Sequence, residues 1–174
     1  MSDKKRYLPF LLSAGVIIID QITKALIVHF IPEGSIGISL FGDFLWICHV
    51  RNDAVAFSLG AGFPEWIKYI LFIGLPVLLM IALSYAIVAH RFDKELSSAE
   101  RWCIAGIVGG GIGNLIDRIF RSLRVVDWIS TNNYGVFGME RFPTYNIADA
   151  SEVISVIFLV IIVLFTERRK KSDE

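Results

Sequence analysis

Residues 66–89 read WIKYILFIGLPVLLMIALSYAIVA, an apolar stretch of 24 residues in which Lys68 is the one charged side chain. An α-helix rises about 1.5 Å per residue, so this stretch extends about 36 Å, which exceeds the roughly 30 Å hydrocarbon core of a bilayer. The stretch therefore predicts a transmembrane helix, and Pro76 near its middle predicts a kink.

Three other stretches are long and apolar enough to span a membrane, namely residues 7–30, 102–120 and 147–165. The chain has 174 residues, of which 55% are hydrophobic and 20% are charged. Four such helices leave too little polar surface for a soluble protein, and the abundance of apolar side chains excludes a disordered one. We therefore predict a single domain over residues 1–174, an all-α integral membrane protein with four transmembrane helices.

The distribution of Lys and Arg predicts the orientation of the spans. Seventeen basic and seventeen acidic residues give zero net charge, which argues against a nucleic-acid partner. Ten of the seventeen basic residues fall in residues 4–6, 91–101 and 168–171. Because basic residues accumulate in cytoplasmic loops, both termini are expected on the cytoplasmic side. Residues 31–65 and 121–146 are then extracytoplasmic.

The two extracytoplasmic segments differ in their sequence pattern. Residues 31–65 combine several glycines with short apolar stretches, which is typical of short strands joined by turns. Residues 121–146 contain Asn and Gly near their middle and predict a loop with a short helix.

The cysteines and histidines indicate neither a disulfide nor a metal site. Cys48 is extracytoplasmic and Cys103 lies at the cytoplasmic start of a span, so the bilayer separates them beyond the roughly 7 Å reach of a disulfide. The three histidines lack ligand spacing, and no motif indicates a cofactor. The glycines at 106, 109, 110 and 113 lack the signature of a phosphate-binding loop and are expected to serve close helix packing.

Polar side chains inside the predicted spans are costly and are therefore candidate functional groups. They fall on one face of each helix, three or four residues apart. They are Asp20 and Lys24, then Asn114, Asp117 and Arg118, then Asn146, Asp149 and Glu152. Counted along the spans at about 1.5 Å per residue, all lie toward the outer third of the bilayer, and Asp127 follows the third span closely. One polar site near the extracytoplasmic face is the simplest interpretation.

Two carboxylates in one water-accessible site can hydrolyse a peptide bond. Like charges a few ångströms apart do not both ionise easily, so one acid stays protonated and polarises the carbonyl while the other takes a proton from water. Spacing alone decides neither which two acids act together nor which holds the proton. Asp127 and Asp149 are the better candidates, because Arg124 is the one basic residue three or four positions from either.

Each polar residue also has a structural interpretation. Asp20 with Lys24, and Asp117 with Arg118, fit charge pairs that neutralise one another and hold helices together. Asn114 fits an interhelical hydrogen-bond donor, and Glu152 fits a solvated acid at the membrane interface.

Two other classes of membrane protein compete with a hydrolase. An ion- or proton-coupled transporter would use intramembrane Asp and Lys as a relay, and it requires charged groups through the full membrane depth. A non-enzymatic assembly factor would use the Gly-rich helix packing, and it would tolerate replacement of the two acids.

Five ordered blocks resemble the bacterial lipoprotein signal peptidases (signal peptidase II). The blocks are residues 20–24 (DQITK), 51–58 (RNDAVAFS), 113–118 (GNLIDR), 125–129 (VVDWI) and 142–149 (FPTYNIAD). Each block alone is weak, but five in order on four spans are specific and cover nearly the whole chain. The resemblance implies an aspartic endopeptidase of the bacterial inner membrane, which cleaves a diacylglyceryl-modified prolipoprotein just before its lipidated cysteine.

The resemblance also implies roles for single residues. By motif position, Asp127 and Asp149 form the catalytic dyad. The positions that orient the substrate or the dyad are Asn52, Asn114, Arg118 and Asn146. Those that support the fold and the site are Asp20, Lys24 and Asp117. Ala56 and Ala148 are further site positions. The chain departs from the family at Ala54, where Gly is usual, and the added methyl group could tighten the substrate groove.

The family further implies the surroundings of the site. Residues 31–65 resemble its small β-cradle and residues 121–146 its extramembrane helix. No metal or cofactor is expected. The expected partners are the prolipoprotein substrate, membrane lipid and the antibiotic globomycin, which would occupy the same site on a monomeric enzyme.

Overall fold

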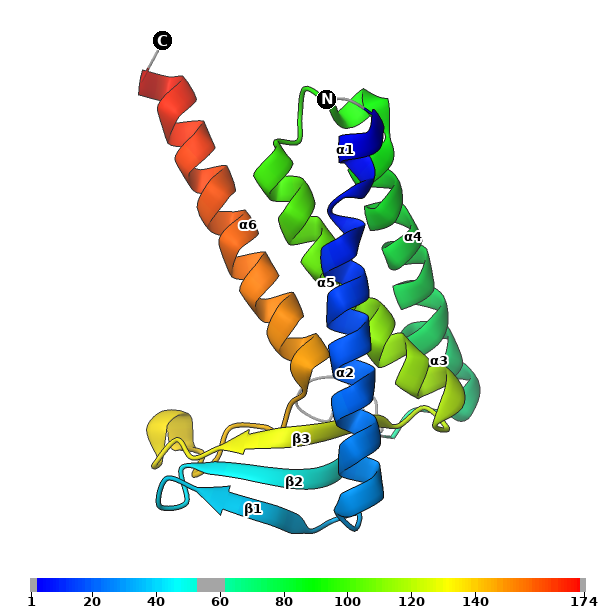
Figure 1. Cartoon of the computed structure of the whole chain (residues 1–174), viewed down its shortest axis with the longest axis vertical. Helices are drawn as coiled ribbons and strands as arrows, with labels where there is room; N and C mark the ends of the chain where they lie inside the picture. Colours follow the sequence, from blue (N-terminus) through cyan, green and yellow to red (C-terminus); the bar gives the residue numbers. More distant parts are fainter. Residues whose placement is uncertain (1–2, 53–61, 173–174) are drawn as a thin grey trace.

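The structure is a computed structural model that describes residues 3–52 and 62–172. Its α-helices are α1 (Asp3–Tyr7), α2 (Phe10–Phe30), α3 (Glu65–Tyr69), α4 (Leu75–Val88), α5 (Ser98–Phe120) and α6 (Ile147–Ser172). Short π- and 3₁₀-helical turns are η2 (Ile70–Gly74), η3 (His90–Phe92) and η4 (Val136–Gly138). The strands are β1 (Ile36–Leu40), β2 (Leu45–Asn52) and β3 (Val125–Thr131). Figure 1 shows the long helices as a bundle with the strands together at one end.

Four helical segments are long and apolar enough to cross a membrane, as the sequence predicted. They are Lys5–Phe30, Glu65–Val88, Ser98–Phe120 and Ile147–Thr166. The third, α5, is the central helix, because 61% of its apolar window is buried against 28% or less in the others. The outward faces of the other helices carry exposed Leu, Ile, Val and Phe side chains, as expected for helices in contact with lipid. The chain is therefore a multi-pass membrane protein built around α5.

Glycines let α2 and α6 approach α5 closely, as predicted for the Gly-rich residues 106–113. A Cβ atom on Gly109 would lie 2.9 Å from Cα of Ser13 in α2. A Cβ atom on Gly110 would lie 2.5 Å from the backbone oxygen of Ala148 in α6. Because backbone atoms cannot move aside as a flexible side chain can, a larger residue at either position would push the helices apart.

The second span changes its helical geometry just before Pro76. The π-helical turn η2 follows α3 and runs into α4, and the N–H of Leu75 bonds to the carbonyl of Ile70, five residues back. Such wide turns are a recognised cause of kinks. The sequence placed the irregularity at Pro76, and the structure places it in the turn that ends at Gly74.

The three strands form one antiparallel sheet in the order β1-β2-β3. β1 and β2 confirm the prediction of short strands in residues 31–65. The prediction of a loop with a short helix for residues 121–146 was wrong for β3, and η4 is the one helical turn in this stretch among the described residues. Val125, Val126 and Asp127 at the start of β3 are all buried, so the strand lacks the alternation that reveals a half-buried strand in a sequence.

The sheet lies at the end of the bundle where α2 ends and α6 begins (Figure 1). In the register of β2 with β3, Val50 is opposite Asp127 and Asn52 is opposite Val125. This pairing holds the end of β2 beside the start of β3, next to the end of α5. The sheet therefore brings Asn52 and Asp127 to the polar end of the helices.

A second group of buried charges lies at the opposite end of the bundle. Arg101 of α5 is 2% exposed and donates hydrogen bonds to the carbonyl oxygens of Ala86 and Ile87 in the last turn of α4. Asp93 accepts from both Arg101 and Arg6, which ties α1 and α5 to the same helix end. Cations at a helix C-terminus satisfy carbonyl groups that have no partner within the helix. This clamp holds three helices together far from the sheet.

Candidate active site

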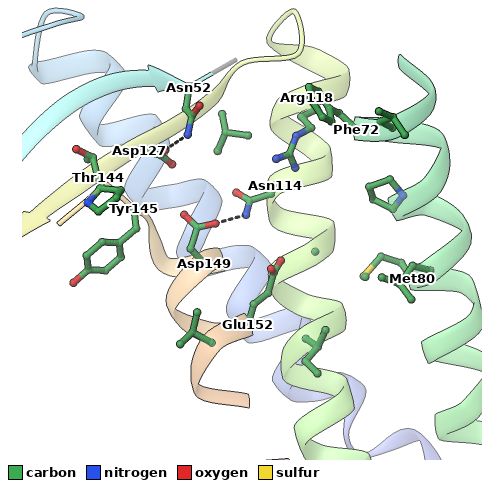
Figure 2. Close-up of a pocket in the computed structure, with 18 of the residues that line it drawn as sticks. Asn52, Phe72, Met80, Asn114, Arg118, Asp127, Thr144, Tyr145, Asp149 and Glu152 are labelled. Carbon is green, nitrogen blue, oxygen red and sulfur yellow. Dashed lines mark hydrogen bonds between the residues drawn. The ribbon is translucent and has the colours of Figure 1, made fainter. Parts of the chain in front are cut away.

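A cavity of about 600 Å³ lies between α4, α5 and α6, next to the sheet (Figure 2). Side chains of α4 make one wall apolar, and polar side chains make the other. The polar lining residues are Asn52, Asn114, Arg118, Asp127, Thr144, Tyr145, Asp149 and Glu152. Residues of β2, β3, α5 and α6, far apart in the sequence, therefore meet at one cavity.

Asp127 enters the cavity from β3 and is only 3% exposed. Its two carboxylate oxygens accept hydrogen bonds from the side-chain amides of Asn52 at 3.1 Å and Asn146 at 2.7 Å. Burial, followed by the negative charge of Asp149, raises the pKa of Asp127 to about 7. Asp127 is thus an acid that can hold a proton near neutral pH.

Asp149 lies in the first turn of α6, opposite Asp127. Its backbone N–H donates to Oδ1 of Asn146, and the backbone N–H of Asn146 donates back to Oδ2 of Asp149, both at 3.0 Å. This reciprocal pair is of the capping-box type and fixes the start of the helix. The side-chain amide of Asn114 donates to the other oxygen at 2.8 Å. The hydrogen bonds and the positive end of the helix dipole stabilise a negative charge on Asp149.

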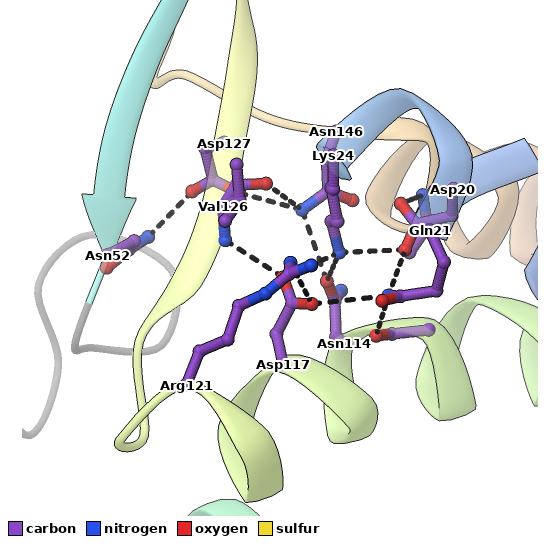
Figure 3. Close-up of polar contacts among 12 residues, drawn as sticks. Asp20, Gln21, Lys24, Asn52, Asn114, Asp117, Arg121, Val126, Asp127 and Asn146 are labelled. Atoms are coloured by element: carbon purple, nitrogen blue, oxygen red, sulfur yellow. Dashed lines mark hydrogen bonds and ion pairs between the residues drawn. The ribbon is translucent and has the colours of Figure 1, made fainter. Parts of the chain in front are cut away.

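Two asparagines connect the acids to each other: Figure 3 shows Asn146 between Asp127 and Asn114, and Figure 2 shows the bond from Asn114 to Asp149. Nδ2 of Asn146 donates to Asp127 at 2.7 Å and to Oδ1 of Asn114 at 3.1 Å. Because Oδ1 of Asn114 accepts there, its Nδ2 is directed to Asp149. The amide orientations of both asparagines are therefore determined by the network, and both acids receive donors.

Lys24 lies behind the cavity, fully buried among three partners (Figure 3). Its Nζ is 2.8 Å from Asp20, 3.1 Å from Asp117 and 3.0 Å from Oδ1 of Asn114. Arg121 adds a second ion pair to Asp117 at 2.6 Å. Two cations therefore balance two buried carboxylates, and the Asp20–Lys24 charge pair that the sequence suggested is present.

The two buried carboxylates each hold the backbone one residue before a cavity acid. Asp20 accepts from the N–H of Ala148 at 3.0 Å, and Asp117 accepts from the N–H of Val126 at 2.9 Å. Ala148 and Val126 are both fully buried. The start of α6 and the start of β3 are thus anchored to one charge cluster, which we call the anchor and define as Asp20, Lys24, Asp117 and Arg121.

Gln21 and Arg121 also belong to this arrangement, although the sequence pattern did not single them out as site residues. Nε2 of Gln21 lies within 3.2 Å of Asp20 and Asp117 and donates to the carbonyl of Gly113 at 3.0 Å. Gln21 was present in the DQITK block, and Arg121 is four residues after Asp117, so the helical spacing was the available signal.

Two expectations about charged residues were wrong. Asp117 pairs with Lys24 and Arg121, not with its neighbour Arg118. Arg118 instead lines the cavity. Glu152 is not a solvated acid at the membrane interface, because it is half-buried and also lines the cavity. Asn114 is an interhelical donor, as expected, and its acceptor is Asp149.

Ala56 and Ala54 lie outside the described residues. Cys48 and Cys103 are both free thiols. Within residues 3–52 and 62–172, no three His, Cys, Asp or Glu side chains converge as ligands of a metal ion.

The chain is similar to known proteins over nearly its whole length. The family model described as "Signal peptidase (SPase) II" matches residues 12–165. A lipoprotein signal peptidase of Treponema denticola is 50% identical over 151 residues, which cover 86% of this chain and 85% of the relative. One of Borrelia hermsii is 38% identical over 158 residues, which cover 91% and 89%.

The fold is similar to a solved structure described as a bacterial membrane enzyme at 2.3 Å resolution. The two chains are 31% identical, with a TM-score of 0.77, and the match covers 95% of this chain and 93% of that one. The likeness therefore includes both the helices and the sheet.

Proposed function

The chain belongs to the signal peptidase II family, and we propose that it removes the signal peptide from prolipoproteins as an aspartic endopeptidase, with Asp127 and Asp149 as its catalytic dyad. The observation that carries this proposal is that these two carboxyl groups line one cavity and are joined through Asn146. Both receive donated hydrogen bonds, and neither is neutralised by an ion pair among the described residues.

The dyad is asymmetric, and the asymmetry supports a division of labour. Asp127 lies on a strand, is nearly fully buried and has a pKa of about 7, so it is the acid that holds a proton. Asp149 lies at the positive end of α6 and accepts two hydrogen bonds, from the side-chain amide of Asn114 and the backbone N–H of Asn146, so it is the carboxylate. Unequal environments of this kind allow one acid and one base to act at the same pH.

Peptide hydrolysis then follows in two steps. Asp149 takes a proton from a water molecule, the water oxygen attacks the scissile carbonyl carbon, and Asp127 gives its proton to the carbonyl oxygen. In the second step the carbon–nitrogen bond breaks. Asp149 returns its proton to the leaving nitrogen, and Asp127 recovers one from the hydroxyl group of the tetrahedral intermediate. The products are a signal peptide with a new carboxyl group and a lipoprotein with a free amino-terminal cysteine.

The surrounding residues have supporting roles in this proposal. Asn52 and Asn146 position Asp127, and Asn114 positions Asp149. Arg118 can donate to a substrate carbonyl, because its guanidinium lines the cavity and makes no direct hydrogen bond or ion pair within the described part of the chain. The anchor, with Ala148 packed against it, holds the elements that carry both acids. Ala56 is proposed as a site position from the motif alone.

The cavity is suited to a lipid-modified substrate. It lies within the membrane-spanning part of the bundle, near its sheet end, and one wall is formed by apolar side chains of η2 (Leu71 and Phe72) and α4 (Leu79 and Met80). A diacylglyceryl group can remain in lipid while the adjacent peptide reaches the dyad. We therefore propose that the substrate carries diacylglycerol on the cysteine that follows the cut.

The remaining proposals concern the setting of the enzyme. The positions of the basic residues favour cytoplasmic termini and a site at the extracytoplasmic face of the inner membrane. Residues 1–174 would act as one domain and as a monomer. Globomycin would inhibit by occupying the cavity.

A cleavage assay tests the substrate. Purified protein in detergent is incubated with a prolipoprotein that carries diacylglycerol on its cysteine, and with the same chain lacking the lipid. We expect a mobility shift for the lipidated form alone, and loss of the shift when globomycin is added. Equal cleavage of both forms would refute the role of the lipid, and no cleavage of either would refute the proposed activity.

A further inference from the structure

A third carboxyl group, Glu152, lines the cavity one helical turn beyond Asp149 (Figure 2). A separation of three residues keeps both side chains on one face of α6, with Glu152 about 4.5 Å farther from the sheet end. Glu152 is half-buried, and in the described part of the chain its carboxyl group makes no hydrogen bond or ion pair. Neither the dyad nor the anchor uses it.

The position of Glu152 depends on a glycine of α5. A Cβ atom on Gly110 would lie 2.6 Å from Cγ of Glu152 and 3.2 Å from its Oε1. The missing side chain therefore leaves the space in which the Glu152 stem packs. An acid held in a spanning bundle without a direct hydrogen bond or ion pair is costly, which makes it a candidate for contact with a ligand.

Arg118 on α5 provides the opposite chemistry in the same cavity. Its guanidinium can only donate hydrogen bonds, whereas an ionised carboxylate can only accept them. Figure 2 shows Arg118 toward the sheet, Glu152 away from it, and Asn114 and Asp149 at the level between them. The cavity thus offers a donor on one side of Asp149 and an acceptor on the other.

A peptide that is cut in this cavity has to be unwound from a helix, which leaves its backbone N–H and C=O groups without intrahelical partners. Such groups need partners wherever the membrane excludes water. Around Glu152 the cavity wall consists of apolar side chains, including Met80, Ile107 and Val153. Glu152 is therefore the side-chain acceptor available to an N–H group at that depth.

We infer that Glu152 helps to bind the substrate by accepting a hydrogen bond from one of its backbone N–H groups, on the signal-peptide side of the cut. The inference rests on the proposed function. In a signal peptide that enters from the cytoplasmic side, the residues before the cut lie deeper in the membrane than the scissile bond. That deeper position is the level of Glu152.

Ester substitution in the substrate tests this hydrogen bond. Three lipidated substrates each replace one of the peptide N–H groups preceding the cut by an ester oxygen, and each is compared with the all-amide form. Glu152→Leu removes the acceptor, Glu152→Gln keeps a weaker one, and Glu140→Gln removes a charge from an exposed loop as the matched control. The readouts are kcat/KM for each pair and the thermal unfolding temperature of each variant.

We expect E152L to lower kcat/KM for the amide substrate by roughly tenfold to a hundredfold, the usual range for a hydrogen bond to a charged group, and E152Q by about fivefold or less. At one ester position, kcat/KM of the wild type should fall by a similar factor relative to the amide substrate. For E152L, kcat/KM should be the same for that ester and for the amide. E140Q behaves as the wild type on every substrate.

Three results would overturn the inference. The first is that E152L cleaves the amide substrate with the kcat/KM of the wild type. The second is that E152L lowers kcat/KM by the same factor for the amide and for every ester. The third is that the wild type has the same kcat/KM for the amide and for all three esters. The last result can be obtained even if E152L does not fold. If the wild type cleaves no lipidated prolipoprotein at all, the proposed function fails and the inference fails with it, whereas normal wild-type cleavage with any of the three results overturns the inference alone.

Discussion

Replacement of Lys24 by Met removes the charge at the centre of the anchor while keeping a side chain of similar length. Lys24 is 0% exposed, and its Nζ contacts Asp20, Asp117 and Asn114 at 2.8, 3.1 and 3.0 Å. In K24M, Arg121 still pairs with Asp117, but Asp20 is left as a buried carboxylate without a cation.

The size of the effect follows from that unpaired charge. Removing one partner of a buried ion pair costs about 3–5 kcal/mol, because the remaining charge stays desolvated. For a chain of this length, each kcal/mol corresponds to roughly 2–4 °C, so the unfolding temperature should fall by about 6–20 °C. Cleavage should also fall, since Asp20 and Asp117 hold the backbone beside both dyad acids.

The matched comparison is the double variant Asp20→Asn with Lys24→Met. It removes one charge of each sign, leaves the pair between Asp117 and Arg121, and keeps a side-chain oxygen for the N–H of Ala148. Thermal unfolding in detergent is followed by tryptophan fluorescence for the wild type, both single variants and the double variant. The double variant should recover about 1–3 kcal/mol relative to the sum of the single losses.

The reasoning would be refuted by either of two results. If K24M unfolds at the wild-type temperature, the buried charge is not held by the contacts described here. If the losses of the single variants simply add in the double variant, Asp20 and Lys24 are not energetically coupled.

Two other predictions concern the dyad and the helix packing. Because the proton on Asp127 is lost as the pH rises through its pKa of about 7, kcat/KM should decline on the alkaline side with a midpoint near that value. Asn52→Leu removes a hydrogen bond that lowers the pKa of Asp127, so the pH profile of this variant should shift to higher pH. An unshifted profile would contradict the assignment of the proton to Asp127. Gly109→Val should destabilise the protein by at least about 1–3 kcal/mol in thermal unfolding, because the new side chain meets the backbone of Ser13. In Gly15→Ala the new methyl group meets nothing within 4 Å, so this variant should be neutral or slightly stabilising. Equal unfolding temperatures of the two variants would contradict the close packing.

The membrane-spanning helices and the dyad candidates could be predicted from the sequence because single strong effects determine them. Apolar length alone separates a span from other helices, and an ionisable residue within a span is too costly to be incidental. Asp127 and Asp149 stood out because Arg124 is the one basic residue three or four positions from either of them in the sequence. The structure agrees to the extent that both line one cavity.

The strand β3 could not be predicted because its burial comes from two directions. Val126 packs against Ile27 and Ile31 at the end of α2, whereas Val125 and Asp127 line the cavity, so all three are buried in succession. Without alternation, the sequence of this stretch resembles a loop between two spans. Only its pairing with β2 makes it a strand.

The pairing of the buried charges could not be predicted from the sequence either. Asp117 has a basic neighbour at the next position, but a helix directs adjacent side chains to different faces, so Arg118 faces the cavity while Lys24 and Arg121 reach Asp117. The bond from Ala148 to Asp20 joins residues at opposite ends of the chain, which spacing along one helix cannot reveal.

The most direct test of the account replaces each dyad acid in turn by its amide. Asp127→Asn and Asp149→Asn are compared with the wild type in cleavage of a lipidated prolipoprotein, and the unfolding temperature of each variant confirms that it is folded. Loss of general acid or base catalysis predicts that cleavage falls by about a hundredfold to ten-thousandfold in both variants while the fold is retained. A folded Asp127→Asn or Asp149→Asn enzyme that cleaves at the wild-type rate would contradict the catalytic dyad.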